Sequence, residues 1–374
     1  MWIPPWVRRL QIPVGFGGFH VALLGSPFPE DAFILVYDCG SLMQQHACDW
    51  AVRVGREISS CGAQVDLAVL SHTDFDHVCG IESLAKSVHI ETLMLPRITV
   101  SFRAAHTAAV SPSKPLWYRR FVADPLAWAR AHGISRVIFV DGEPGDGEAG
   151  PVEQTRNPPD GDRAGQPILG SGRSTRQERG ETVVSSGDPH PIQSGTTTDW
   201  WIVPIVAPPK SSAGLTDALA SELQGKDPSD IYAGLSMRKK SSLRNRLARV
   251  YRRYWKDTNR SSVMLLVARP GASGGWLCTG DANLREAETQ RRLGQHARLF
   301  AGVDAIQVPH HGSPHNLDAQ AAHWLRSLSP RSLAWVVSSG KNQWRYPHHS
   351  VESACQKLYG PREASCNWSD VVPF

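Results

Sequence analysis

A short apolar run that ends in a cluster of metal-binding side chains constrains this chain more than any other feature. The run "VDLAVL" spans residues 65–70 and predicts a buried strand. Four potential ligands follow within six residues, namely His72, Asp74, Asp76 and His77. Because binding residues concentrate on loops that leave a rigid scaffold, we expect a functional site where this strand ends.

The same arrangement recurs at other strand-like runs. Apolar runs at 32–41, 274–281, 303–313 and 332–340 each lead into polar residues, and helical stretches separate several of them. This alternation predicts a layered α/β fold with its site along one edge of the sheets. The candidate residues at or after these strand ends are Asp38, Asp281, His310, His311, Lys341 and His348.

Two segments depart from this alternation. Residues 141–195 are rich in Gly, Pro, Ser and charged residues, so we expect a long loop insertion there. Residues 210–260 are predicted to form a helical insertion. We expect one domain over residues 1–374 that carries both insertions.

Basic residues are concentrated within the helical insertion. Residues 236–260 hold ten Lys or Arg and one Asp, a local charge of +9, which leaves −4 for the rest of a chain whose net charge is +5. Leu243, Leu247, Val250, Tyr251 and Tyr254 fall on one face of the expected helix. The remaining faces offer arginines for phosphate contacts. The arginines predicted to bind nucleic acid are Arg244, Arg249, Arg252 and Arg253. The alternatives are a solubilising surface helix and a docking surface for an acidic protein partner.

Bulk features exclude several classes of protein. The seven cysteines include no C-x-x-C pair, which argues against a disulfide framework and against a zinc ribbon. The apolar runs are too short to cross a bilayer, and the first residues lack the apolar region of a secretory signal. We therefore expect a soluble, cytoplasmic protein.

Four motifs in order resemble the metallo-β-lactamase superfamily. They are "SHTDFDHVCG", "LCTGD", "VPHHGS" and "SSGKN" followed by Pro347-His348. They are most similar to the ComEC-like branch, the soluble domain of a bacterial DNA-uptake membrane protein, in which Asp is usual at the position of Asp74. The resemblance implies a four-layer αββα metallo-β-lactamase sandwich with a two-metal site at one edge.

The resemblance also implies a ligand set. His72 and Asp74 would hold one ion, Asp76 and His77 the other, and Asp281 would bridge both. His311 would complete the second ion, with His310 as the fallback. The ligands expected are thus His72, Asp74, Asp76, His77, Asp281 and His311. Asp38 is expected to orient His72 through a hydrogen bond.

The implied reaction is hydrolysis by a hydroxide that bridges two divalent ions. Because the ligand set is rich in oxygen, Mn²⁺ or Mg²⁺ competes with Zn²⁺. The residues expected to take part in catalysis are Asp76, His310, His348 and Lys341. The branch and the basic helix favour a nuclease or phosphodiesterase acting on DNA or RNA. The alternatives are a hydrolase of a small ester, lactone or thioester, and the metallo-hydrolase component of a multi-protein system, possibly one for defence.

Overall fold

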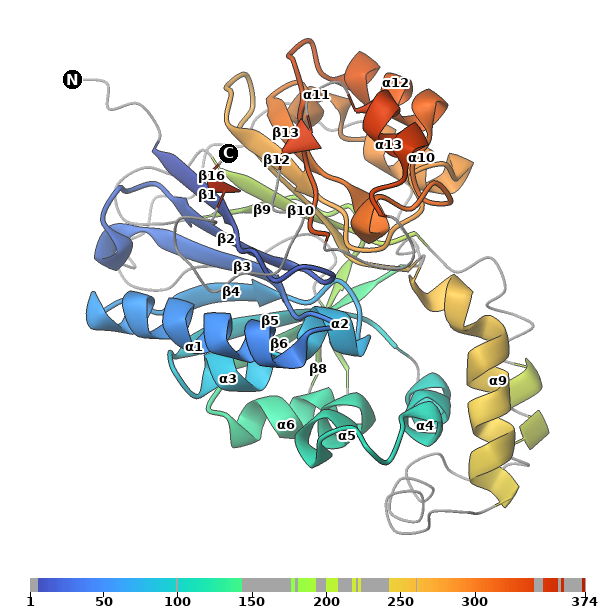
Figure 1. Ribbon diagram of the computed structural model, residues 1–374. Coiled ribbons are helices and arrows are strands. Elements are labelled where there is room, and N and C mark those ends of the chain that lie inside the picture. Colours follow the sequence, from blue (N-terminus) through green and yellow to red (C-terminus); the bar gives the residue numbers. More distant parts are fainter. Residues whose placement is uncertain are drawn as a thin grey trace.

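The chain folds into two β-sheets that pack face to face between layers of helices, as the computed structural model in Figure 1 shows. The structure describes residues 6–98, 100–142, 176–178, 181–192, 200–207, 217–219, 221–222, 242–259, 261–339, 346–355, 358–359 and 372–373.

The first sheet has nine strands within the described residues, in the order β16-β1-β2-β3-β4-β5-β6-β8-β7. Strands β3, β4, β5, β6 and β8 run parallel to their neighbours in that series. Every residue of β3 is buried, as expected for a central parallel strand. The strands are β1 (Val7–Gln11), β2 (Phe19–Leu24), β3 (Phe33–Cys39), β4 (Val65–Val69), β5 (Ile90–Pro96), β6 (Arg136–Asp141), β7 (Arg176–Glu178), β8 (Glu181–Ser185) and β16 (Val372–Pro373).

The second sheet has seven strands in the described part of the chain, in the order β15-β14-β13-β12-β11-β10-β9. Strands β11 and β12 pair antiparallel. From β12 to β15 the pairing is parallel, so these strands share one carboxyl edge. The strands are β9 (His190–Pro191), β10 (Trp201–Ile205), β11 (Met264–Ala268), β12 (Gly275–Cys278), β13 (Val303–Gln307), β14 (Ala334–Val336) and β15 (Leu358–Tyr359).

Helices cover the outer face of each sheet (Figure 1). The α-helices described are α1 (Gln44–Ser60), α2 (Phe75–Val78), α3 (Ile81–Ala85), α4 (Val100–Ala109), α5 (Leu116–Ala123), α6 (Pro125–Ala131), α9 (Ser242–Asn259), α10 (Ala287–Gly294), α11 (Ala297–Phe300), α12 (Ala319–Leu328) and α13 (His349–Ala354). Two 3₁₀ turns are η1 (Pro29–Asp31) and η2 (Pro309–Gly312).

Three separate apolar cores define the layers. One joins the first sheet to its helices, with Trp50 of α1 and Phe121 of α5 fully buried in it. A second lies between the two sheets and includes Trp200 and Trp276. The third joins the second sheet to α10–α13 around Trp335 and Phe300. The predicted four-layer αββα sandwich is therefore confirmed.

The segment expected to be a loop insertion contains strands. Residues 141–195 were expected to be a loop, yet β7, β8 and β9 lie among their described residues, and β8 extends the first sheet beside β6. Pairing with an existing sheet edge outweighs local composition there. At the other end of the chain, α13 ends at Ala354, and Leu358–Tyr359 forms β15.

Helices α4 and α9 form a smaller unit beside the sandwich (Figure 1). Leu243, Leu247, Val250 and Tyr251 of α9 pack with residues of α4 in a fourth apolar cluster. The apolar face predicted for the basic helix is confirmed for these four residues. Among the described residues, no helix is both long and apolar enough to cross a bilayer.

Candidate metal centre

The candidate ligands lie where strands of both sheets end. Asp38 is the penultimate residue of β3, and His72 follows β4 by three positions. Asp281 follows β12 by three positions, and His311 lies in η2 directly after β13. Because neighbouring parallel strands end at the same edge, segments far apart in sequence meet there.

Backbone shape brings these loops into contact. Asp38, His310 and His311 have positive φ values of 53°, 47° and 56°, which non-glycine residues adopt rarely and at a cost of about 1–3 kcal/mol. A Cβ atom at Gly18 would lie 2.7 Å from Oδ2 of Asp38, so the glycine leaves room for that carboxylate. The strained residues therefore coincide with the candidate site.

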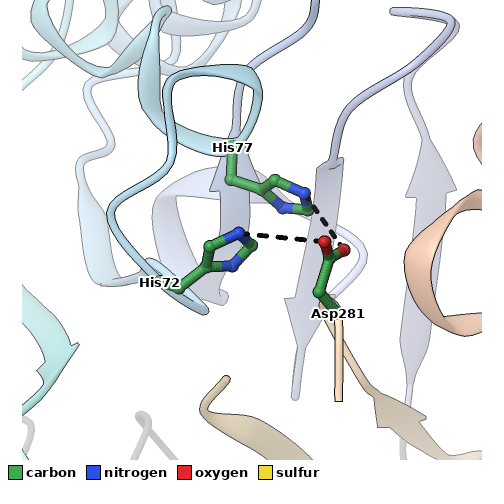
Figure 2. A group of neighbouring side chains, drawn as sticks. All are labelled: His72, His77 and Asp281. Atoms are coloured by element: carbon green, nitrogen blue, oxygen red, sulfur yellow. Dashed lines mark ion pairs between the residues drawn. The ribbon is translucent and has the colours of Figure 1, made fainter. Parts of the chain in front are cut away.

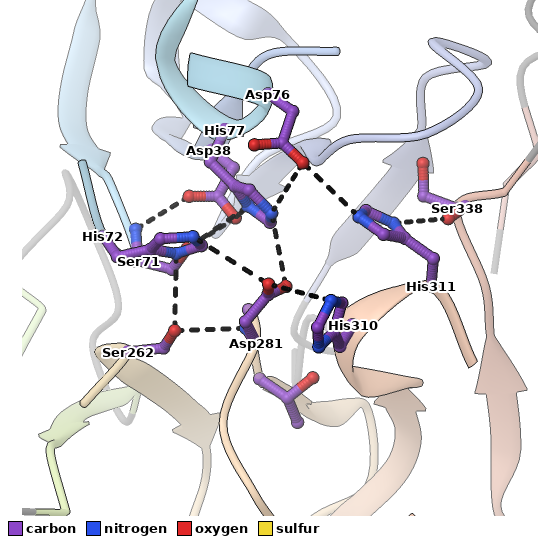
Figure 3. Close-up of polar contacts among 12 residues, drawn as sticks. Asp38, Ser71, His72, Asp76, His77, Ser262, Asp281, His310, His311 and Ser338 are labelled. Carbon is purple, nitrogen blue, oxygen red and sulfur yellow. Dashed lines mark hydrogen bonds and ion pairs between the residues drawn. The ribbon is translucent and has the colours of Figure 1, made fainter. Parts of the chain in front are cut away.

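The Nδ1 atom of His77 is fixed by Asp38. It lies 2.8 Å from Asp38 Oδ2, and both side chains are buried (Figure 3). Since an ionised carboxylate only accepts hydrogen bonds, Nδ1 of His77 carries the proton. The Nε2 atom of a neutral His77 is then left with its lone pair.

His72 is held by two serines. Ser71 donates its hydroxyl hydrogen to Asp38 Oδ2 at 2.9 Å, so its oxygen accepts from His72 Nδ1, also at 2.9 Å. The hydroxyl of Ser262 lies 3.3 Å from the same nitrogen. The prediction that Asp38 bonds His72 directly is corrected, because Asp38 bonds His77 and reaches His72 only through Ser71.

His311 is oriented in the same way. Its Nδ1 donates to the carbonyl oxygen of Ser338 at 3.0 Å, which fixes the proton on that nitrogen. The ring packs edge-on against Phe16, with centroids 5.2 Å apart. His72, His77 and His311 therefore all use Nδ1 to bind the protein and turn Nε2 toward the centre of the site (Figure 3).

Two carboxylates face these Nε2 atoms. Oδ1 of Asp281 lies 3.2 Å from His77 Nε2, and Oδ2 lies 3.9 Å from His72 Nε2 (Figure 2). Oδ2 of Asp76 lies 3.9 Å from His77 Nε2 and 3.8 Å from His311 Nε2. The side chains thus form two groups that share His77. The groups able to hold an ion are His72, His77 and Asp281, and Asp76, His77 and His311.

The carboxylates make this centre electronegative. Burial by itself would lower the pKa of His77, but the charges of Asp281 and Asp38 raise it well above its ordinary value. Burial works to raise the pKa of Asp281, yet His77 and His310 hold it well below the usual range. For Asp76, burial is outweighed by His311 and His77, and the pKa falls to about 2. The site therefore favours two ionised carboxylates around a positive charge.

The donor set fits divalent metal ions. The Nε2 atoms of His72 and His77 are buried and have no hydrogen-bond partner within the described residues. A lone pair on Nε2 that faces a carboxylate oxygen is repulsive unless a cation lies between them. Imidazoles fixed through their other nitrogen by carboxylate, carbonyl or hydroxyl groups are typical of metal ligands.

Asp74 belongs to neither group. Its Oδ1 accepts a hydrogen bond of 3.3 Å from the hydroxyl of Tyr251 on α9. The ring of Tyr251 stacks on His106 of α4, with centroids 4.5 Å apart and an angle of 8° between planes. The structure thus brings five of the six predicted ligands together and places Asp74 against the helical insertion.

His310 lies beside the first group. Its Nε2 is 3.6 Å from Oδ2 of Asp281, and its Nδ1 is 3.1 Å from the side-chain oxygen of Asn316. The amide nitrogen of Asn316 donates to the backbone oxygen of Asp281 at 2.8 Å. About a third of the His310 side chain is exposed, so this ring lies at the rim of the site.

The remaining catalytic predictions fall outside this cluster. His348 caps α13, since its Nδ1 accepts from the backbone nitrogen of Ser350, and it belongs to neither metal group. Lys341 lies outside the described residues. Any role for either residue in catalysis stays a prediction.

Sequence reasoning missed the residues that hold the ligands in place. They are Ser71, Ser262, Asn316, Ser338, His106 and Tyr251. Ser71 directly precedes His72, and Asn316 follows His311 by five residues, so proximity to the motifs could have suggested them. Tyr251 was assigned only to the apolar face of its helix, and its contact with Asp74 depends on tertiary structure.

The predicted nucleic-acid-binding arginines divide into two kinds. Arg244 faces α4 and donates to the backbone oxygens of Ala108 and Val110 at 3.2 and 3.1 Å. It therefore satisfies carbonyls at the end of α4. Arg249, Arg252 and Arg253 are exposed on α9.

Comparisons with known proteins give weak similarity. No family model matches the chain. No curated protein matches it either. Among solved structures, MEM-A1, a subclass B3 metallo-β-lactamase from a soil metagenome library, is 13% identical with a TM-score of 0.30, covering 84% of this chain and 80% of that one. A metallo-β-lactamase with a HARLDQ motif from Cronobacter sakazakii is 12% identical with a TM-score of 0.31, covering 87% of this chain and 91% of that one.

Proposed function

We propose that this protein is a metal-dependent hydrolase that cleaves phosphodiesters of DNA or RNA. The observation that carries the proposal is the orientation of His72, His77 and His311. Each presents Nε2 toward Asp281 or Asp76 while Nδ1 is held by the protein. The four sequence motifs, which occur in the same order as in the ComEC-like branch that they resemble, also favour phosphodiester hydrolysis.

The two groups suggest where ions would bind. His72, His77 and Asp281 would hold one, and Asp76, His77 and His311 would hold the other. Since one Nε2 cannot serve two ions, His77 would join one of them. Bound divalent ions would stabilise charge on a phosphoryl oxygen and supply a nucleophile from water near neutral pH.

The protein itself contributes orientation and a hydrogen-bonding group. Asp38 and Ser71 fix both His72 and His77, so two ligands depend on one buried carboxylate. His310 has its Nε2 atom 3.6 Å from Oδ2 of Asp281 and is partly exposed, so it could hydrogen-bond a substrate oxygen. Such fixed polar groups contribute to catalysis because they need no reorganisation during the reaction.

Two features favour a phosphodiester over a neutral ester. Asp76 and Asp281 supply hard oxygen ligands, which suit Mn²⁺ and Mg²⁺ as well as Zn²⁺. The arginines exposed on α9 add positive charge at the helix that contacts Asp74.

The test is hydrolysis by metal-free protein titrated with Zn²⁺, Mn²⁺ or Mg²⁺. The substrates are labelled DNA, labelled RNA, bis(p-nitrophenyl) phosphate and p-nitrophenyl acetate as a neutral ester. We expect metal-dependent cleavage of the phosphodiesters and a loss of more than about 100-fold in Asp281→Asn. Asp66→Asn is the matched control, since Asp66 is a partly buried carboxylate that accepts a hydrogen bond from the backbone nitrogen of Ile34.

Two results would contradict the proposal. One is turnover of the neutral ester with no cleavage of any phosphodiester, which would favour a small-ester hydrolase. The other is phosphodiester cleavage that Asp281→Asn leaves unchanged, which would exclude this metal centre as the catalytic site.

A further inference from the structure

The inner face of helix α9 packs against other parts of the protein. Leu247 is fully buried and Tyr251 is 7% exposed in the cluster shared with α4. Arg244 binds the carboxyl end of α4, and Arg246 forms an ion pair of 2.6 Å with Glu222. These side chains keep the helix in place, so they are not available to a ligand.

The outer face of the same helix is positively charged. Arg249, Arg252 and Arg253 are all exposed, and their spacing of three and four residues places them together on one side. That side lies opposite Leu247 on a helix of 3.6 residues per turn. Asp257 is the one acidic residue in the sequence of α9. The result is a row of exposed arginines on this side of the helix.

This row belongs to a helix that contacts the loop between β4 and α2, which also carries the candidate ligand His72. The hydroxyl of Tyr251 donates to Asp74 at 3.3 Å, and Tyr251 is adjacent in sequence to Arg252. On the other side, His106 of α4 stacks on Tyr251 and lies 3.3 Å from the hydroxyl of Thr73. The helix is thus connected to the ligand loop at two successive residues, Thr73 and Asp74.

We propose that the outer face of α9, formed by Arg249, Arg252 and Arg253, binds the phosphate backbone of the nucleic acid that the metal centre cleaves. A row of guanidinium groups matches the repeated charges of a polyanion, whereas a small phosphodiester would engage few of them. The charge is local, since the chain outside residues 236–260 sums to −4. The inference rests on the proposed function, because it identifies the surface that holds a polymeric substrate.

Binding is measured apart from catalysis, with fluorescence anisotropy of a labelled single strand and its duplex in excess chelator. The variant R249Q/R252Q/R253Q removes the row, and R56Q/R130Q/R298Q is the matched control. The control removes three exposed arginines from α1, α6 and α11, with the same change in net charge. Kd is determined from about 50 to about 200 mM salt.

We expect wild-type and control proteins to bind with the same steep salt dependence. The slope of log K against log salt should fall in magnitude by about three in the α9 variant, close to one for each lost phosphate contact. With metal added, the α9 variant should lose cleavage of the polymer at low substrate concentration but keep wild-type turnover of bis(p-nitrophenyl) phosphate.

Several outcomes overturn the inference. The first is that the wild-type protein does not bind nucleic acid. The second is that the two triple variants have equal salt slopes. The third is that the α9 variant loses turnover of bis(p-nitrophenyl) phosphate as much as it loses cleavage of the polymer. The proposed function fails separately, when the metal-loaded wild type hydrolyses neither substrate. Wild-type cleavage of both substrates with unaltered binding by the α9 variant would leave the proposed function intact and exclude α9 as the substrate surface.

Discussion

Asp38 shows how one buried carboxylate organises the site at the scale of single residues. It bonds the backbone nitrogen and the hydroxyl of Ser71 and the Nδ1 atom of His77, at 2.7, 2.9 and 2.8 Å. Its φ of 53° is a backbone conformation that Asp and Asn tolerate better than most residues. Replacement by Asn therefore tests the charge while it keeps shape and backbone.

We expect Asp38→Asn to remain folded and to bind metal about 10–100-fold more weakly, because His77 loses a charged partner. The measurement is competition between the protein and a chromogenic chelator for Zn²⁺ or Mn²⁺, with circular dichroism to monitor folding. Asp66→Asn serves again as the control. A folded Asp38→Asn protein with wild-type metal affinity would show that Asp38 has no influence on the ligands.

The hydrogen bond from Tyr251 gives a second test at this scale. Tyr251→Phe removes the hydroxyl that donates to Asp74 and keeps the ring that stacks on His106. If Asp74 is a ligand, this bond orients its carboxylate, and we expect metal affinity to fall roughly tenfold. Tyr118→Phe is the matched control, since that hydroxyl donates to the backbone oxygen of Thr73 in the same loop.

The metal affinities of these variants decide whether Asp74 is a ligand. Equal metal affinity in Tyr251→Phe, Tyr118→Phe and the wild-type protein would contradict a role for Asp74 as a ligand. A loss confined to Tyr251→Phe would support it, because only that variant removes the contact with the carboxylate.

The ligand positions were accessible from the sequence because each follows a recognisable apolar strand. The contacts that hold these ligands in place could not be predicted from the sequence. Ser262, for example, precedes β11 and lies 3.3 Å from His72, yet 190 residues separate the two in sequence. A serine carries no periodic signal, so its hydrogen bonds emerge only when the strands are assembled. For the same reason, His72 was predicted as the hydrogen-bond partner of Asp38, whereas the partners are His77 and Ser71.

At the scale of elements, α4 and α9 illustrate what hydrophobic periodicity can and cannot predict. The spacing of Leu243, Leu247, Val250 and Tyr251 predicted which face of α9 is buried. It did not identify the partner helix. Helix α4 supplies Phe102, Ala105 and Ala108 to the shared cluster, and this cluster is separate from the three cores of the sandwich.

We therefore expect Leu247→Ala to act mainly on the α4–α9 unit. Leu247 is fully buried, so truncation should cost about 2–5 kcal/mol of local stability. Hydrogen exchange should become faster in α4 and α9, with protection in β3, β4 and β13 retained. Leu243→Ala is the milder comparison, since Leu243 is only partly buried. Equal loss of protection in the central strands would show that the helical unit and the sandwich unfold together.

At the scale of the whole molecule, the buried core between the sheets couples folding to pH. Burial lowers the pKa of His20 to about 3 from its ordinary value of 6.5, and Arg9 acts in the same direction. The unfolded chain therefore binds more protons than the folded protein between these two values. Stability from neutral His20 is complete above pH 6.5 and is lost as the pH falls through this window.

We expect His20→Gln to weaken this pH dependence. Between neutral pH and about pH 5, His20 accounts for a loss of roughly 2 kcal/mol in the free energy of unfolding, which a glutamine cannot contribute. Denaturant titrations in excess chelator, at several pH values, would measure the difference between the two proteins. His190 and His296, whose pKa values burial lowers to about 4, titrate in both proteins and cancel from that difference. A difference that does not vary between neutral pH and about pH 5 would mean that His20 is protonated equally in the folded and unfolded chains, and that the space between the sheets admits its charge.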